Sequence, residues 1–206
     1  MYYKLLSFGD VIELKTQINP YKLFDEIKHF DSSWKVYNPR RENNRFGLSV
    51  TSSDGDLNGI DLDSVPQYNE EYNTSYTETS FKEKTQVYYD SEEVRKIVEP
   101  FNKHLCRTHI INLKKNGSFP PHRDWLFVDR QESFRIFVPL KDCNSPSMYF
   151  MYEKELLHFE HGRAYFINTN KEHCVFSFSD DTVFMVMNIE CNKDSINAVL
   201  SNMISR

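Results

Sequence analysis

The residue types best suited to catalysis in this sequence are a histidine and an aspartate two positions apart, His122 and Asp124. Pro120 and Pro121 precede them and favour an extended backbone, in which side chains two positions apart point to the same side. One imidazole and one carboxylate therefore converge. A third ligand has to come from elsewhere in the chain, and His173 lies in a second segment that is expected to be extended.

Two imidazoles and one carboxylate on one side of a metal ion leave the opposite positions open, as in non-haem Fe(II) oxygenases. His122, Asp124 and His173 are therefore the predicted metal ligands. A plainer interpretation stands beside this one, because a His-x-Asp pair occurs by chance in many chains and a lone imidazole is often satisfied by hydrogen bonds in a loop. The remaining histidines follow no comparable pattern and are interpreted as structural or surface residues: His29, His104, His109, His158 and His161.

A single arginine, Arg135, lies in the apolar run SFRIFVPL at residues 133–140. Strand alternation places the apolar residues at even positions on one face and Arg135 with Phe137 on the other. A charge in such a strand needs a counter-anion, and a guanidinium grips a carboxylate with two parallel hydrogen bonds. Arg135 is therefore the candidate for binding a carboxylate ligand, with an internal salt bridge to a protein carboxylate as the alternative. Arg123 and Arg163 are weaker candidates.

The composition limits the classes of protein that fit. A chain of 206 residues is expected to form one domain with a substantial core, residues 1–206. The net charge of −5 gives no electrostatic reason to expect a nucleic-acid partner. The four cysteines lie far apart in the sequence and form no C-x-x-C motif. This spacing suggests neither a zinc site nor a disulfide framework, so we expect reduced thiols. The first residues form neither a basic leader nor a long apolar segment, so we expect a cytoplasmic protein without a membrane partner.

Three helices are predicted from capping residues and apolar spacing. The first follows Asn19, the second follows Ser91, and the third follows Asn192 or Asp194 within residues 192–206. All three place their apolar residues on one face, so we expect them to pack on the outside of the core.

Short apolar runs separated by turn residues fill residues 105–191, at the spacing of a jelly roll or barrel. The predicted strands are 106–113, 133–140, 147–152, 163–167, 174–178 and 183–189, with turns at 116–117, 144–146 and 161–162. Residues 1–104 are expected to supply a short first strand, two of the helices and, at 31–90, an irregular cover over one mouth of the barrel. Strand-like pieces in that cover are 46–50 and 87–89, and decorative surface is the alternative interpretation of the whole segment.

The stretch from about 105 to 190 resembles the aspartyl/asparaginyl β-hydroxylase-like branch of the Fe(II)- and 2-oxoglutarate-dependent oxygenases. INLKKNGSFPPHRD resembles that branch's strand, glycine turn and first ligand motif, and FRIFVPL resembles its arginine strand. EHGRAYFINTNKEHCVFSFSDD resembles its glycine turn, strand and distal histidine. The similar pieces occur in the right order and cover under half of the chain.

The resemblance implies a mainly β fold with flanking helices (α+β), built on a double-stranded β-helix of the jelly-roll, cupin-like kind. It implies Fe(II) bound by His122, Asp124 and His173, with Arg135 reaching 2-oxoglutarate. Two positions depart from the family pattern. Phe137 stands where the arginine strand usually has histidine, and no basic residue lies near Val183, where a second arginine is usual. Either Arg135 carries the whole salt bridge to the cosubstrate, or another residue substitutes.

The activity implied by the resemblance is hydroxylation of a C–H bond in an amino-acid or peptidyl substrate, coupled to decarboxylation of 2-oxoglutarate. Two other functions stay open. One is a cupin-like metal or small-molecule binding protein without 2-oxoglutarate turnover, which the two departures favour. The other is a metal-dependent enzyme that uses the same three ligands without 2-oxoglutarate.

Overall fold

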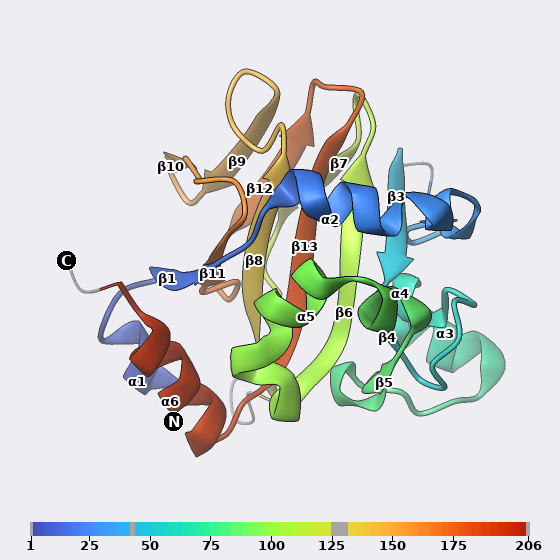
Figure 1. Ribbon diagram of the computed structural model, residues 1–206, viewed down its shortest axis with the longest axis horizontal. Coiled ribbons are helices and arrows are strands. Elements are labelled where there is room, and N and C mark those ends of the chain that lie inside the picture. The colour runs from blue at the N-terminus through green and yellow to red at the C-terminus, as the bar shows by residue number, and fades with distance from the viewer. Residues whose placement is uncertain (1, 42–43, 125–131, 205–206) are drawn as a thin grey trace.

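Two antiparallel β-sheets form the centre of the computed structural model, which describes residues 2–41, 44–124 and 132–204 (Figure 1). The larger sheet has the strand order β1-β11-β8-β13-β6-β3-β2 and the smaller one the order β10-β9-β12-β7. The larger sheet consists of β1 (Val11–Gln17), β2 (Lys35–Val36), β3 (Arg45–Ser49), β6 (Leu105–Leu113), β8 (Ser133–Lys141), β11 (Arg163–Ile167) and β13 (Thr182–Glu190). The smaller sheet consists of β7 (Ser118–His122), β9 (Met148–Tyr152), β10 (Glu155–Leu157) and β12 (His173–Ser177).

The chain crosses repeatedly between the sheets from β6 to β13. Strands β6, β8, β11 and β13 lie in the larger sheet, and β7, β9, β10 and β12 lie in the smaller one. This alternation is the topology of a double-stranded β-helix, so the predicted mainly β jelly-roll core is confirmed.

Helices and short connecting elements cover the larger sheet. They are α1 (Tyr3–Leu6), α2 (Pro20–Ile27), η1 (Lys28–Ser33), β4 (Thr51–Ser52), η2 (Ile60–Leu62), α3 (Val65–Tyr72), η3 (Glu78–Ser80), β5 (Glu83–Lys84), α4 (Gln86–Asp90), α5 (Glu92–Val98), η4 (Glu99–His104) and α6 (Lys193–Asn202). The predicted caps are confirmed, because the side chains of Asn19, Ser91 and Asn192 accept backbone N–H groups at the starts of α2, α5 and α6. Residues 205–206 of the third predicted helix lie outside the described residues.

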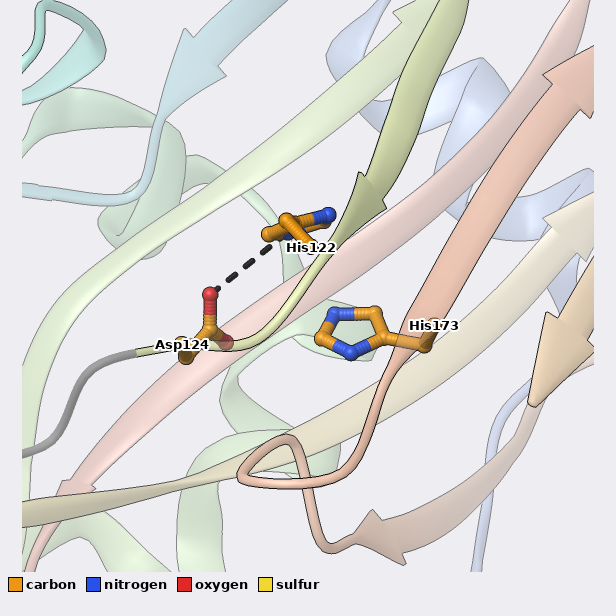
Figure 2. A group of neighbouring side chains, drawn as sticks. All are labelled: His122, Asp124 and His173. Carbon is orange, nitrogen blue, oxygen red and sulfur yellow. Dashed lines mark ion pairs between the residues drawn. The ribbon is translucent and has the colours of Figure 1, made fainter. Parts of the chain in front are cut away.

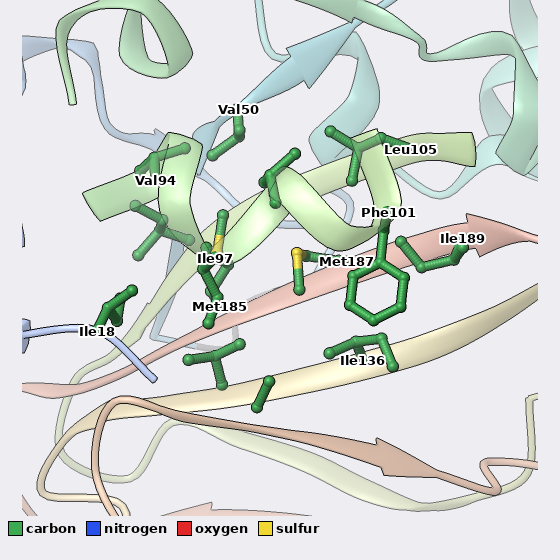
Figure 3. Close-up of a cluster of buried hydrophobic side chains, with 14 of the residues drawn as sticks. Ile18, Val50, Val94, Ile97, Phe101, Leu105, Ile136, Met185, Met187 and Ile189 are labelled. Atoms are coloured by element: carbon green, nitrogen blue, oxygen red, sulfur yellow. The ribbon is translucent and has the colours of Figure 1, made fainter. Parts of the chain in front are cut away.

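The outer face of the larger sheet packs against these helices (Figure 3). Ile97 of α5 and Phe101 of η4 lie over Met185 and Met187 of β13 and Ile136 of β8, and all five side chains are fully buried. Large buried apolar side chains each stabilise a fold by about 1.5–3 kcal/mol. This cluster holds strands β8 and β13 in place from their outer face. The inner face of the same strands lines the barrel interior.

Aromatic side chains fill much of the space between the two sheets. The rings of Phe137, Phe150, Phe159 and Phe184 pack with centroids 4.9–5.4 Å apart. The predicted alternation in β8 is therefore confirmed: its even-numbered apolar residues join the outer cluster and Phe137 faces inward. An aromatic plug of this kind closes the barrel interior beyond the level of Arg135.

The N-terminal half departs from the predicted pattern in three places. A helix, α1, precedes the first strand, β1. The piece at 87–89, predicted to resemble a strand, belongs to helix α4, in which Val87 is fully buried. A short apolar run does not distinguish a buried helix from a buried strand. The strand-like piece predicted at 46–50 is confirmed as β3, but the segment 31–90 is more regular than predicted, since it also contains β2, η2, α3 and η3.

No helix of the described ranges is long and apolar enough to cross a membrane.

Candidate metal centre

The three predicted ligands meet at one end of the barrel (Figure 2). His122 ends β7 and His173 begins β12, and the two are register partners in the smaller sheet. Asp124 follows β7, where its backbone N–H donates to the carbonyl of Thr169 at 2.9 Å. One ligand atom from each of the three side chains lies within 4.8 Å of the other two. The pairing of β7 with β12 thus unites residues from distant parts of the chain.

The ring nitrogens of both histidines are assigned by their backbone contacts. Nδ1 of His122 lies 2.7 Å from the carbonyl oxygen of Pro120, and Nδ1 of His173 lies 2.9 Å from that of Lys171. A carbonyl only accepts, so each Nδ1 carries the proton and donates. Each Nε2 then keeps a free lone pair, which is the state in which imidazole binds a metal.

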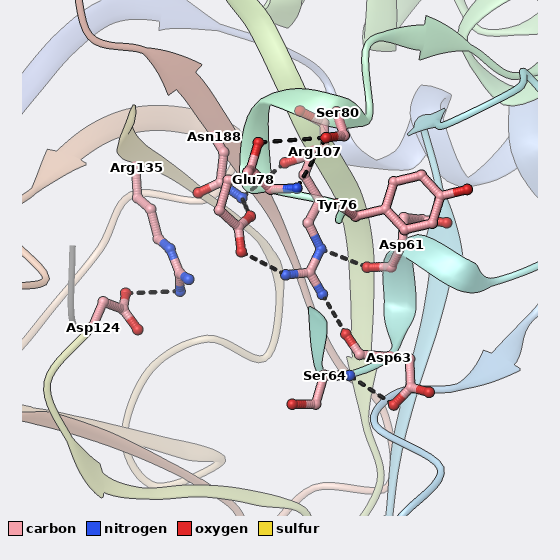
Figure 4. Close-up of polar contacts among 12 residues, drawn as sticks. Asp61, Asp63, Ser64, Tyr76, Glu78, Ser80, Arg107, Asp124, Arg135 and Asn188 are labelled. Atoms are coloured by element: carbon pink, nitrogen blue, oxygen red, sulfur yellow. Dashed lines mark hydrogen bonds and ion pairs between the residues drawn. The ribbon is translucent and has the colours of Figure 1, made fainter. Parts of the chain in front are cut away.

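The carboxylate of Asp124 has two different neighbours. Its Oδ1 lies 3.6 Å from Nε2 of His122, whereas its Oδ2 forms an ion pair with Nη1 of Arg135 at 2.9 Å (Figure 4). One oxygen is therefore directed at the metal position and the other is held by the guanidinium. Outer contacts of this kind orient a metal ligand.

The internal ion pair with Asp124 is the alternative that the sequence left open for Arg135. The weaker candidates lie elsewhere: Arg163 pairs with Glu13 and Glu160, and Arg123 is exposed. Of these three arginines, Arg135 alone contacts the predicted ligand set within the described residues.

Burial favours the uncharged form of His173. The residue is only 6% exposed, and this desolvation lowers the pKa of its imidazole below the ordinary value. A neutral imidazole is the metal-binding form, so the site needs no proton removal from His173 at neutral pH. Two imidazoles and one carboxylate fit Fe(II), whose facial triad has this composition.

A small cavity of about 60 Å³ lies beside the ligands, inside the barrel. Its wall contains His122, His173 and Arg135 at the metal end, together with apolar side chains and one threonine. The remaining lining residues are Phe119, Phe137, Phe150, Ile167, Thr169, Val175, Phe184 and Val186. Among these described lining residues Arg135 is the only permanent cation.

The residues fit one half of 2-oxoglutarate better than the other. The metal-binding half, a carboxylate beside a ketone, fits a triad with open positions and Arg135 nearby. The far carboxylate would lie among Phe137, Phe150 and Phe184, and an unpaired buried carboxylate is costly. The far half of 2-oxoglutarate therefore does not fit the described lining of the barrel.

His109, interpreted from the sequence as a structural or surface residue, is buried. It lies on the inner face of β6 opposite Val186, is 3% exposed, and its ring packs against Tyr37 at 5.2 Å. Burial lowers its pKa well below the ordinary value. Its Nδ1 has no hydrogen-bond partner among the described residues. The alternation of β6, with Ile111 two positions further on and also facing inward, is a signal that could have located it.

A buried network fastens the segment before α4 to the same end of the barrel (Figure 4). Nη1 of Arg107 donates to Glu78 at 2.8 Å, and its Nη2 donates to the carbonyl of Asp63 at 2.8 Å. Asn188, the register partner of Arg135, donates to the other oxygen of Glu78 at 3.0 Å. The segment 31–90, which was predicted to cover one barrel mouth, thus contacts β13 beside Arg135 through Glu78 of η3.

No protein-family model and no curated protein matches the chain. Among solved structures, a Pseudomonas putida prolyl-4-hydroxylase matches with a TM-score of 0.52 and 8% identity, over 92% of this chain and 96% of that one. An RmlC-like cupin from Shewanella frigidimarina matches with a TM-score of 0.32 and 11% identity, over 46% and 73%. A predicted oxalate decarboxylase from Thermotoga maritima matches with a TM-score of 0.32 and 14% identity, over 46% and 74%.

At this identity, the match over almost the whole chain is evidence of fold alone. It agrees with the strand order, in which two sheets enclose a barrel with helices on the larger one. The aspartyl/asparaginyl β-hydroxylase branch stays a prediction. The chain therefore has a mainly β jelly-roll core, with His122, Asp124 and His173 gathered at one end.

Proposed function

We propose that the protein is a non-haem Fe(II)-dependent dioxygenase that hydroxylates a C–H bond of an amino-acid or peptidyl substrate and consumes a 2-oxo acid. The observation that carries the proposal is the approach of one ligand atom each from His122, Asp124 and His173 to within 4.8 Å of one another. This donor set occupies one side of a metal and leaves the other side for cosubstrate and oxygen.

The reaction has a defined balance. A substrate R–H, O₂ and a 2-oxo acid R′–CO–COO⁻ give R–OH, the shortened acid R′–COO⁻ and CO₂. Oxygen is the oxidant, and one of its atoms enters each organic product. Bound Fe(II) supplies the redox chemistry and the open positions at which the reactants meet.

The chain's own residues position and protect this chemistry. The carbonyls of Pro120 and Lys171 hold the two imidazoles with Nε2 directed toward the metal position. Arg135 orients Asp124 and places a positive charge beside the carboxylate of an incoming 2-oxo acid. The apolar wall excludes water from the interior, which strengthens these electrostatic contacts.

A metal or small-molecule binding protein without turnover is the second candidate. The ion pair between Arg135 and Asp124 favours it, because a guanidinium already compensated by a protein carboxylate attracts a ligand carboxylate less strongly.

The two functions differ in what happens when oxygen is admitted. The protein is loaded with one equivalent of Fe(II) without air, mixed with either 2-oxoglutarate or 2-oxopentanoate, and then exposed to O₂. Ascorbate is included as the two-electron reductant that takes the place of R–H, so that the second oxygen atom leaves as water. Under these conditions an oxygenase releases CO₂ with succinate or butanoate, and a binding protein leaves both acids intact.

Asp124→Ala supplies the test of the ligand assignment, since it removes the carboxylate and should abolish iron binding and acid consumption. Asp25→Ala is the matched control, because Asp25 is an exposed carboxylate on α2 paired only with Lys28 in the described contacts. Unchanged activity of Asp124→Ala would end the assignment.

A further inference from the structure

We infer that the cavity beside the metal ligands takes the side chain of a short, uncharged 2-oxo acid, such as 2-oxopentanoate, in preference to 2-oxoglutarate. The inference rests on the proposed function and names its cosubstrate class. The observation that supports it is the lining of the cavity, which is polar at the metal ligands and apolar deeper in the barrel.

The direction in which a bound acid extends follows from the strands. Arg135 lies at the metal end of β8, where it contacts Asp124. Phe137 is the next inward-facing residue of that strand, about 7 Å deeper at the usual strand rise. An acid whose carboxylate and ketone lie at the metal therefore directs its remaining carbons toward Phe137 and its neighbour Phe184, whose ring centroids are 5.1 Å apart.

Among the described lining residues, the wall at that depth carries no charged side chain. Phe137, Phe150 and Phe184 are each at most 5% exposed, so water does not replace the missing cation. Val175 and Val186 add further apolar surface. A terminal methyl group gains free energy there by leaving water, whereas a carboxylate loses its hydration without a partner.

Among the described lining residues, Arg135 is the permanent cation. It lies at the metal end of the cavity, beside the carboxylate and ketone of the acid and not beside its far end. Its Nη1 is held by Asp124, so the guanidinium stays at the level of the ligands. Its buried Nε has no hydrogen-bond partner among the described residues and is available to the carboxylate beside the metal. The nearby Arg45 stacks over the ring of Phe119 at 4.3 Å and is not part of the cavity wall.

The size of the cavity agrees with a short alkyl chain. A volume of about 60 Å³ holds on the order of two water molecules, so the smaller of two side chains fits it better. The propyl group of 2-oxopentanoate has three carbon atoms, whereas the side chain of 2-oxoglutarate has five heavy atoms. The two acids share the same carbon skeleton, so they differ only in the terminal methyl or carboxylate.

The experiment is an anaerobic titration of the Fe(II)-loaded 206-residue chain with each acid, followed through the weak visible charge-transfer band of an iron-chelated 2-oxo acid. We expect 2-oxopentanoate to bind at least tenfold more tightly than 2-oxoglutarate. In the series pyruvate, 2-oxobutanoate and 2-oxopentanoate, affinity should rise about fourfold for each added methylene group.

Phe184→Arg tests the cause, because it places a cation in the apolar wall. This variant should bind 2-oxoglutarate more tightly and 2-oxopentanoate more weakly than the unaltered protein. Phe178→Arg makes the same change at a residue that is 55% exposed, and should leave both affinities unchanged. The comparison of the two acids on the unaltered protein stands even if Phe184→Arg does not fold.

The outcomes separate this inference from the proposed function. Equal or tighter binding of 2-oxoglutarate would overturn the inference and leave the 2-oxo acid dependence in place. Iron binding without a band from any of the acids would overturn both.

Discussion

At the scale of single residues, the function of the site depends on which atoms are already engaged by the protein. Both histidines use Nδ1 for a backbone carbonyl, and Asp124 gives one oxygen to Arg135. Each ligand therefore has one free atom and one anchored atom. A metal ion meets side chains whose orientation is fixed before it binds, which reduces the entropy lost on binding.

Replacing Arg135 tests this orientation. In Arg135→Gln the carboxylate of Asp124 loses its ion pair, so it is less well held and we expect Fe(II) affinity to fall about 10–100-fold. Competition with a metallochromic chelator measures the change. Arg123→Gln is the matched control, since that arginine is exposed, and it should bind iron as the unaltered protein does. An unchanged affinity in Arg135→Gln would mean that the ion pair does not position the ligand.

His109 makes stability depend on pH. Its folded pKa lies well below the ordinary value of about 6.5 because the ring is buried, with Arg107 and Arg135 acting in the same direction. The unfolded chain therefore binds a proton that the folded chain does not as pH falls below about 6.5. This contribution to the free energy of unfolding is complete above that pH and decreases by up to about 1.4 kcal/mol per unit below it.

The measurement is urea unfolding at pH 7.0 and pH 5.5 for the protein and for His109→Gln. The unaltered protein should lose more stability than the variant between these two values. Asp61, whose pKa burial raises to about 6, acts with the opposite sign, but it is present in both proteins and cancels from the difference. Equal losses would show that His109 binds protons equally in the folded and the unfolded chain, and would contradict the lowered pKa.

At the scale of elements, β6 connects the site to the cover above it. Its inward-facing residues include Arg107 and His109, and Arg107 reaches Glu78 of η3 and the backbone between η2 and α3. One buried guanidinium therefore holds a segment whose neighbouring short strands, β4 and β5, pair with each other in a separate two-stranded sheet. This contact gives the cover a fixed position at the metal end of the barrel.

Removing the charge of Glu78 should loosen that element. Glu78→Gln removes the carboxylate that forms the ion pair with the buried guanidinium of Arg107, and we expect the free energy of unfolding to fall by about 3 kcal/mol. Glu71→Gln is the comparison, because Glu71 pairs with Arg40 at a residue half exposed to solvent, and its loss should cost at most about 1 kcal/mol. Urea denaturation measures both. A loss in Glu78→Gln no larger than that in Glu71→Gln would argue against the anchoring role.

At the scale of the whole molecule, the larger sheet separates two apolar clusters with different tasks. The outer cluster joins helices to the sheet, and the inner one fills the barrel beyond the metal ligands. Strands β8 and β13 contribute side chains to both. Substitutions on the outer face should therefore change stability without changing ligand selection, whereas substitutions on the inner face should change both.

One pair of substitutions separates these tasks. Phe101→Ala creates a cavity in the outer cluster and should lower the free energy of unfolding by about 3–5 kcal/mol without changing iron or 2-oxo acid affinity. Phe137→Ala should also destabilise the protein, but it enlarges the inner cavity and should weaken the preference for 2-oxopentanoate. Calorimetry gives the stabilities and the visible band gives the affinities. A changed acid preference in Phe101→Ala would show that the faces are coupled.

The sequence by itself determined the features that depend on neighbours in the chain. The period of two in residues 133–140 placed Phe137 and Arg135 inside, and the capping residues placed the starts of α2, α5 and α6. The strand pattern from 105 to 191 likewise predicted a jelly roll, since the backbone geometry behind it is local. The strand-like prediction at 87–89 was wrong, because so short an apolar run within α4 shows neither a helical nor a strand periodicity clearly.

Only the tertiary structure decided which distant residues meet. The pairing of β7 with β12 brings His173 to His122, and the approach of β8 brings Arg135 to Asp124. The partner of Arg135 was open in the sequence, because a guanidinium accepts any carboxylate and the folded chain selects which one is near. The cavity likewise exists only where strands far apart in the chain face one another, so no local pattern encodes its size or the apolar character of its described wall beyond Arg135.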